Sequence, residues 1–202
     1  MLKPRRCKKK FVLGLTGIFG SGKTTVAGML KALGARVVDA DALARPLLRR
    51  NRPAYQKALR AFGKEILGGH REIDRRKLAR LVFSDKGSLK KLNAILHPEI
   101  IRLIKKRIRG FSGGVIVLDA PLLIEAGLGG LADKIAVVKI SGLKQRQRLS
   151  RRDALTAREI ALRTKSQISQ SRKILLADFV IDNSDSMEKT KKQVKELWRI
   201  MR

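Results

Sequence analysis

Five short, nearly continuous hydrophobic segments stand out along the chain, and each predicts a buried β-strand. Between them lie longer stretches in which apolar residues recur every three or four positions, the spacing of amphipathic helices. Strands that are hydrophobic on both faces are typical of a parallel sheet covered by helices. The expected strands span residues 11–16, 35–41, 113–121, 134–141 and 178–184. The pattern therefore predicts an α/β fold, a five-stranded parallel sheet flanked by helices.

The middle of the chain, residues 42–110, lacks strand signals and predicts a helical insertion between the second and third strands. Its amphipathic segments are separated by Gly, Asp or Pro, and we expect the pair His97-Pro98 to end one helix and begin the next. A second helical region, rich in Lys and Arg, follows the fourth strand at residues 142–176. The chain is thus expected to be a sheet-centred core with two helical additions.

The segment GLTGIFGSGKTT, residues 14–25, fits the pattern G-x-x-x-x-G-K-[ST] through Gly17, Gly22, Lys23 and Thr24. In this motif backbone N–H groups and a helix N-terminus bind phosphates, the lysine reaches the outer phosphates and the hydroxyl ligates Mg²⁺. Strand, loop and helix follow one another in the required order, so the sequence predicts nucleotide binding. The motif does not identify the acceptor, which can be water, a protein, a nucleic acid or a small metabolite.

Acidic residues follow two of the expected strands, where a parallel sheet binds its ligands. Asp39 and Asp41 end the second strand: either one orients an acceptor hydroxyl, or it caps the next helix. Arg45, one helical turn later, is a candidate contact for an acceptor phosphate. Asp119, directly after the residues VIVL near the end of the expected third strand, has the position of an acid that holds Mg²⁺, although an ordinary strand-end role stays open. For Glu125, a site role and a surface role are equally open.

The charge is unusual, with 47 Lys and Arg against 17 Asp and Glu and a net charge of +30. Such an excess suggests a polyanionic partner, but only 4% of residues are aromatic, so stacking on nucleic-acid bases is unexpected. We expect nucleic-acid binding to be incidental. Two roles are open for the arginines of the second basic region, Arg148, Arg152 and Arg163. They either close over a nucleotide and neutralise the charge of the phosphoryl group being transferred, or form a solvated basic face.

Three absences narrow the class of protein. No run of 18 apolar residues predicts a membrane span, and the basic start lacks the apolar stretch of a secretory signal. A single cysteine, Cys7, excludes an internal disulfide framework and a cysteine-built metal site. We expect a cytoplasmic protein, monomeric or weakly oligomeric.

Taken in order, these motifs resemble the dephospho-coenzyme A kinase family over residues 11–200. The resemblance is carried by GLTGIFGSGKTT, VVDADALAR, LNAILHPEI, DAPLLIEAG, RLSRRD, ALRTKSQ and LADFVIDNS. Adenylate and other nucleotide kinases share the phosphate loop but not this set. The resemblance implies transfer of the γ-phosphate of ATP, with Mg²⁺, to the ribose 3′-hydroxyl of dephospho-coenzyme A, the last step of coenzyme A biosynthesis. A nucleoside or nucleotide monophosphate kinase is the alternative, and a nucleic-acid-responsive ATPase a more distant one.

The resemblance also implies a division of the chain. Residues 11–41, 111–141 and 171–202 form the nucleotide-binding core, 42–110 the acceptor domain, 142–170 a lid, and 1–10 a flexible basic extension. The implied nucleotide contacts are Gly17, Ile18, Phe19, Gly20, Ser21, Gly22, Lys23, Thr24, Thr25, Arg148, Arg152 and Asn183. The implied acceptor contacts are Asp41, Arg45, His97, Pro121 and Leu122. Asp41, Lys23 and Arg148 are expected to be catalytic, and Thr24 and Asp119 to hold Mg²⁺.

One departure falls in the phosphate loop. The family loop usually reads G-G-I-G-S-G-K, whereas Ile18 and Phe19 occupy its second and third places here. A β-branched side chain disfavours a positive φ at residue 18. Because Gly20, Gly22, Lys23 and Thr24 remain, we expect nucleotide binding to persist with an altered preference or affinity.

Overall fold

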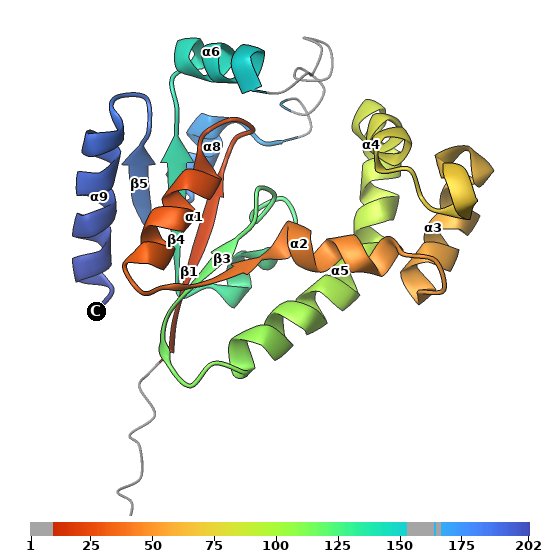
Figure 1. The fold of residues 1–202 in the computed structure, drawn as a ribbon, viewed down its shortest axis with the longest axis horizontal. Coiled ribbons are helices and arrows are strands. Elements are labelled where there is room, and N and C mark those ends of the chain that lie inside the picture. Colours follow the sequence, from red (N-terminus) through yellow and green to blue (C-terminus); the bar gives the residue numbers. More distant parts are fainter. Residues whose placement is uncertain (1–9, 153–163, 165–166) are drawn as a thin grey trace, which may run out of the picture.

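A computed structural model describes residues 10–152, 164 and 167–202. Five parallel strands form one sheet in the order β2-β3-β1-β4-β5, which confirms the predicted fold class (Figure 1). The strands are β1 Lys10–Gly17, β2 Arg36–Asp39, β3 Gly114–Asp119, β4 Lys134–Lys139 and β5 Phe179–Asp182. Lys10 pairs in register with Gly114, so residue 10 belongs to the sheet and not to the flexible extension expected there.

Two helices cover one face of the sheet, α1 (Lys23–Ala32) and α9 (Met187–Ile200). Alternate residues of β1, such as Leu13 and Leu15, point into this layer and are completely buried. They pack in one cluster with Leu30 of α1 and Val194 of α9. This packing fixes the start of α1, which follows the phosphate loop directly, against the end of β1.

The opposite face is covered by α5 (Lys86–Arg109). Its Ile104 is fully buried and packs with Val12, Ile116 and Leu118, the strand residues of opposite parity. Both faces of the central strands are therefore buried, which explains their nearly continuous hydrophobicity in the sequence.

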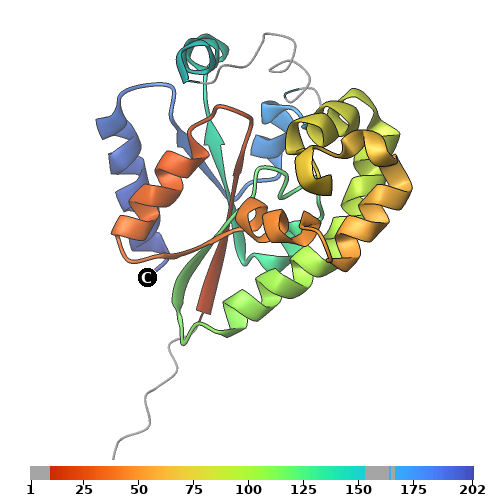
Figure 2. The ribbon, with the colours of Figure 1, turned by 45° about the vertical axis from the view of Figure 1, so that its right-hand side comes forward.

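The segment between β2 and β3 is helical, as predicted, and builds a separate lobe beside the sheet (Figures 1 and 2). It contains α2 Ala40–Ala44, η1 Arg45–Leu48, α3 Pro53–Phe62, η2 Lys64–Ile66, η3 Gly69–Arg71 and α4 Arg75–Ser84, followed by α5. The lobe has its own apolar cluster, centred on Ala58, Phe62, Ile66, Leu78 and Val82.

The predicted helix break at His97-Pro98 is wrong, because α5 runs through Pro98 as one helix of 24 residues. Proline removes a single N–H from the helical ladder. Apolar residues on both sides of it, Leu96 and Ile104, are buried against the rest of the molecule. We attribute the continuity of the helix to this packing on both sides of the proline. A prediction from local helix-breaking residues does not take such tertiary packing into account.

The remaining elements follow β3 and β4. They are η4 Leu128–Leu131, α6 Gly142–Arg152 and α8 Gln170–Leu175. In the described part of the chain, no helix combines the length and the apolar character needed to cross a membrane.

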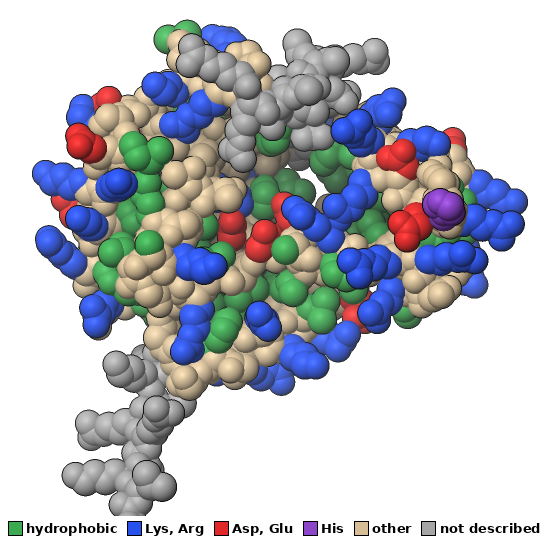
Figure 3. Space-filling model, in the orientation of Figure 1, with side chains coloured by type: hydrophobic (Ala, Val, Ile, Leu, Met, Phe, Trp, Pro, Cys, Tyr) green, Lys and Arg blue, Asp and Glu red, His purple; other side chains and the backbone are tan. Residues whose placement is uncertain are grey.

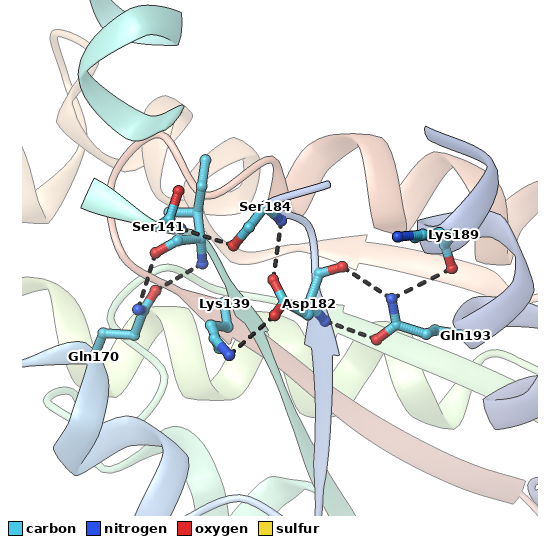
Figure 4. Close-up of polar contacts among 8 residues, drawn as sticks. Lys139, Ser141, Gln170, Asp182, Ser184, Lys189 and Gln193 are labelled. Carbon is cyan, nitrogen blue, oxygen red and sulfur yellow. Dashed lines mark hydrogen bonds and ion pairs between the residues drawn. The ribbon is translucent and has the colours of Figure 1, made fainter. Parts of the chain in front are cut away.

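Two glutamine side chains complete the ends of β4 and β5 (Figure 4). The Gln170 amide accepts from the Ile140 N–H (2.9 Å) and donates to the Ile140 carbonyl (3.0 Å). The Gln193 amide accepts from the Asp182 N–H (2.8 Å) and donates to the Asp182 carbonyl (2.9 Å). Each amide thus bonds both peptide groups of one residue, as a neighbouring strand would. Helix α6 begins shortly after β4, and Asn183 directly follows β5. The four hydrogen bonds therefore fix the positions from which α6 and Asn183 extend toward the phosphate loop.

Candidate active site

A cavity of about 710 Å³ opens at the carboxyl edge of the sheet, beside the phosphate loop. Its wall combines the loop with residues that follow β2, β3, β4 and β5. The lining comprises residues 17–25, Asp39, Asp41, Arg45, Asp119, Pro121, Arg148, Leu149, Gln167, Asn183 and Met187. In Figure 3 a small group of acidic side chains lies near the middle of this face, and Lys and Arg side chains surround it. The register of the sheet explains the grouping, since Asp39 and Asp119 are paired at the ends of adjacent strands.

The phosphate loop is closely packed where its glycines lie. A Cβ atom on Gly17 would lie 2.6 Å from Ser21 Oγ and 2.7 Å from the Val138 carbonyl oxygen, so no side chain fits there. The loop takes positive φ at Gly20 and Gly22, at 79° and 86°. Ile18 does not have a positive φ, since the non-glycine residues of the described chain that do are Asn51, His70 and Arg71. The departure at residue 18 therefore introduces no left-handed strain.

Two glutamines hold the peptide groups of Phe19. The Phe19 N–H donates to Gln167 Oε1 at 2.8 Å, and Gln145 Nε2 donates to the Phe19 carbonyl at 2.5 Å. Gln145 lies on α6 and Gln167 lies shortly before α8, so two residues of the second basic region fix the top of the loop. The sequence reading assigned neither glutamine to the site, although Gln167 ends the motif ALRTKSQ.

Asn183 and Arg148 hold the next part of the loop. The fully buried Asn183 side chain donates to the Ser21 carbonyl (2.8 Å) and accepts from Thr190 Oγ1 (3.0 Å). Arg148 donates to the carbonyl oxygens of Ser21 (3.4 Å) and Asn183 (3.2 Å). These contacts bring the end of β5 and helix α6 onto the loop, on the cavity wall.

Lys23 forms an ion pair with Asp119 across the floor of the cavity. Asp119 is buried, and desolvation raises the pKa of its carboxyl group, an effect that the charge of Lys23 partly offsets. The Lys23 ammonium group thus lies beside the Asp119 carboxylate, in the place where the motif predicts that it contacts the outer phosphates of a nucleotide.

Asp39 at the end of β2 and Asp41 just after it make different contacts. Asp39 caps α2, since its carboxylate accepts the Ala42 N–H at 2.9 Å. The carboxylate of Asp41, in the first turn of the helix, makes no hydrogen bond or ion pair to another residue of the described chain and is open to the cavity. Desolvation by the cavity wall raises its pKa, with Lys23 opposing and Asp39 and Asp119 reinforcing the shift. Asp41 is therefore a carboxylate of raised basicity that is free to accept a hydrogen bond.

The residues at hand fit Mg²⁺ that arrives with a nucleotide. The described residues contain no cluster of three or more His, Cys, Asp and Glu side chains able to hold a metal alone. The cavity does offer two oxygen ligands, the exposed hydroxyl of Thr24 and the carboxylate of Asp119. Mg²⁺ commonly takes one or two protein ligands and completes its shell with phosphates and water.

The other expected site residues divide into three groups. Arg45 and Pro121 line the cavity. His97 and Leu122 are not among its lining residues; the His97 Nε2 atom is buried and has no hydrogen-bond partner among the described residues. Arg152 ends α6, but its side chain lies outside the described part of the chain, as do residues 153–163, which include Arg163.

Glu125 is not a surface residue. Its carboxylate pairs with the buried Lys173, with Lys173 Nζ 2.9 Å from Glu125 Oε1. Lys173 played no part in the sequence reading, because nothing in a local pattern marks one lysine among 47 basic residues as buried.

The family model and the curated relatives in sequence comparisons point to one family. A family model described as dephospho-CoA kinase matches residues 11–189. A dephospho-CoA kinase from Carboxydothermus hydrogenoformans is 44% identical over 186 residues, which cover 91% of this chain and 90% of that relative. Another, from Oceanobacillus iheyensis, is 43% identical over 195 residues, covering 94% and 98%. A crystal structure from Thermus thermophilus is similar with a TM-score of 0.82 and 33% identity, over 96% of this chain and 100% of that one.

Proposed function

This chain belongs to the dephospho-CoA kinase family, and from that premise we propose how its residues carry out the reaction. The protein is a kinase of coenzyme A biosynthesis that uses ATP to phosphorylate the ribose 3′-hydroxyl of dephospho-coenzyme A. The observation that carries the proposed roles is the position of Asp41, an unbonded carboxylate on the same cavity wall as the phosphate loop.

ATP binds with its phosphates in the loop formed by residues 17–25. The backbone N–H groups and the N-terminus of α1 provide the anion site. Lys23, now paired with Asp119, contacts the outer phosphates, and Arg148 approaches them from α6. Positive groups at these places neutralise the charge that develops on the transferred phosphoryl group. Asn183 supports the loop from the end of β5, with the adenine expected nearby.

Asp41 orients the acceptor hydroxyl. A carboxylate of raised pKa accepts the hydroxyl hydrogen bond and takes the proton as the oxygen–phosphorus bond forms. Arg45, one turn later on the same wall, binds an acceptor phosphate. Because Asp39 is occupied by its capping bond to Ala42, Asp41 is the better placed of the two acids.

Thr24 and Asp119 would hold the Mg²⁺ that accompanies ATP, which would neutralise phosphate charge when bound. Dephospho-coenzyme A lies between the sheet and the helical lobe, with Pro121 as a further contact. Leu122 and His97 do not line the cavity, and their contact with the acceptor stays an expectation from the family resemblance. We keep the division into a core, an acceptor domain at residues 42–110 and a lid at 142–170, whose closure excludes water and limits hydrolysis. A cytoplasmic location and a monomeric or weakly oligomeric state fit such an enzyme.

An acceptor screen tests this function. ADP release is measured with ATP and Mg²⁺ against dephospho-coenzyme A, AMP, CMP and nucleosides, and separately with RNA and DNA. We expect dephospho-coenzyme A to support turnover at least 100-fold above every other acceptor, since a site built around one hydroxyl and its phosphates discriminates strongly. Comparable turnover with a nucleoside monophosphate, or stimulation by nucleic acid without a small acceptor, would refute it.

A further inference from the structure

Lys173 is a completely buried lysine behind the phosphate loop, with 0% of its surface exposed. It lies on α8, and its ammonium group makes three kinds of contact. It donates to the Pro121 carbonyl at 2.8 Å, to Glu125 Oε2 at 3.0 Å and to Thr16 Oγ1 at 3.3 Å. All three hydrogens of the ammonium group therefore have acceptors.

Each acceptor belongs to a segment that continues into the cavity wall. Thr16 is the residue directly before Gly17, where the phosphate loop begins, and its hydroxyl also donates to the Pro121 carbonyl at 3.0 Å. Pro121 lines the cavity two residues after Asp119. One ammonium group thus joins the end of β1 to the segment that follows β3.

Glu125 extends the same cluster to the other side of the loop. Its Oε1 atom accepts the Ile168 N–H at 3.1 Å. The neighbouring residue, Gln167, accepts the Phe19 N–H and lines the cavity. The chain of contacts therefore runs from Lys173 through Glu125 and Ile168 to the residue that holds the top of the phosphate loop.

A buried ion pair of this kind is poor evidence of a purely stabilising role. Desolvation lowers the pKa of Lys173, Glu125 opposes the shift, and the charge of Lys23 reinforces it. Replacing both partners of such a pair by apolar residues of similar volume is often neutral or stabilising. An apolar pair at these two positions would lose the hydrogen bonds to the Thr16 hydroxyl, the Pro121 carbonyl and the Ile168 N–H.

We propose that Lys173 and Glu125 are positioning residues for the nucleotide site, which hold the Gln167 side chain against Phe19 and set the cavity wall at Pro121. The proposal rests on the proposed function only in taking ATP as the nucleotide. It predicts that the pair affects ATP affinity, measured without acceptor, through the shape of the loop.

The test compares Lys173→Met, Glu125→Met and the double variant in the full chain. ATP affinity is measured by calorimetry without acceptor, together with the melting temperature and the KM for each substrate. We expect each single variant to bind ATP about 5- to 20-fold more weakly, in the range of other residues that act through a neighbour. In the double variant no buried charge is left unpaired, so its melting temperature returns toward that of the wild type while its ATP affinity stays low.

Leu197→Ala is the matched control, since Leu197 is buried on α9 and does not line the cavity. It lowers the melting temperature without weakening ATP binding. If ATP affinity recovers together with the melting temperature in the double variant, or if Leu197→Ala weakens ATP binding equally, the role is merely structural and the proposal is overturned. If the methionine variants do not fold, Glu125→Gln, which keeps the shape of the side chain, decides by the same ATP measurement.

Because this binding assay contains no acceptor, its result is independent of the acceptor screen. A wild-type protein that binds ATP but does not phosphorylate dephospho-coenzyme A would refute the function and leave the positioning test intact.

Discussion

The side-chain amide of Asn183 donates a hydrogen bond to the Ser21 carbonyl oxygen, 2.8 Å away and 162 residues earlier in the chain. Arg148 donates to the same carbonyl, so the end of β5 and helix α6 meet on one peptide of the phosphate loop. The space between this peptide and the two side chains is filled. A Cβ atom on the next residue, Gly22, would overlap Asn183 Nδ2 and lie 2.9 Å from Arg148 Nη1.

Gly22→Ala should therefore abolish ATP binding. Gly22 has a φ of 86°, which an alanine adopts only with strain, and its new methyl group would displace Asn183 and Arg148 from the loop. We expect ATP affinity to fall by more than 100-fold, since the loop and its two supports move together. Isothermal titration with ATP and Mg²⁺ checks this.

Gly28→Ala is the matched control. Gly28 lies inside α1, and apart from its chain neighbours and the nearby backbone of the helix no atom would lie within 4 Å of its new Cβ. Alanine should stabilise the helix by about 0.5–1 kcal/mol and leave ATP affinity unchanged. Normal ATP binding by Gly22→Ala would mean that the loop does not have the described conformation when ATP is bound.

Arg148→Lys should weaken ATP binding about 10- to 100-fold. A guanidinium group spans the carbonyl oxygens of Ser21 and Asn183, whereas one ammonium group cannot make both contacts in the same geometry. The loss of a hydrogen bond to a charged group, about 1.5–3 kcal/mol, sets the scale. Arg146→Lys, on an exposed position of the same helix, should leave the KM for ATP unchanged. Unchanged ATP affinity in Arg148→Lys would show that the positive charge, which lysine keeps, is sufficient at this position without the two hydrogen bonds.

The sequence predicted the parts of the site that lie close together in the chain. The phosphate loop follows from its motif, and the acids after β2 and β3 follow from the rule that parallel strands end at one edge. Asp39 and Asp41 illustrate the limit of this reasoning. From the sequence, each acid could cap the following helix or orient an acceptor hydroxyl. The hydrogen bond from the Ala42 N–H to Asp39 identifies Asp39 as the cap, which no local pattern indicates.

The supports of the loop could not be predicted in the same way. Gln167 and Gln145 bond the N–H and the carbonyl group of Phe19 although they lie more than 120 residues from it, so no local pattern connects them. Lys173 is hidden for a second reason, because high overall basicity makes each lysine look like part of a solvated face. At Pro98 the local signal for a helix boundary was overruled by packing on both sides of the proline.

Asp41→Asn should be more stable than the wild type at neutral pH. The pKa of Asp41 is raised in the folded protein, so ionisation of this carboxyl group costs stability as pH rises above its ordinary value near 4. The amide carries no such cost. The difference in melting temperature should disappear below about pH 4, where the wild-type carboxyl group is protonated in both states.

Thermal melts between pH 3 and pH 8 measure this difference. For a chain of this length, each kcal/mol corresponds to about 2–4 °C in Tm. A variant that is less stable than the wild type at pH 7 would show that Lys23 and Arg45 outweigh desolvation, and that the carboxylate is not held at a raised pKa.

The central claim is that Asp41 orients and deprotonates the acceptor hydroxyl. The measurement that tests it most directly is the single-turnover rate of phosphoryl transfer to dephospho-coenzyme A, compared among the wild type, Asp41→Asn and Asp39→Asn. We expect Asp41→Asn to slow transfer by a factor on the order of 10²–10⁴ with ATP affinity kept, and to remove the acid limb of the pH–rate profile. Asp39→Asn should keep most of the rate, because asparagine caps a helix about as well as aspartate. Near-normal transfer by Asp41→Asn, or an equal loss in Asp39→Asn, would contradict the claim.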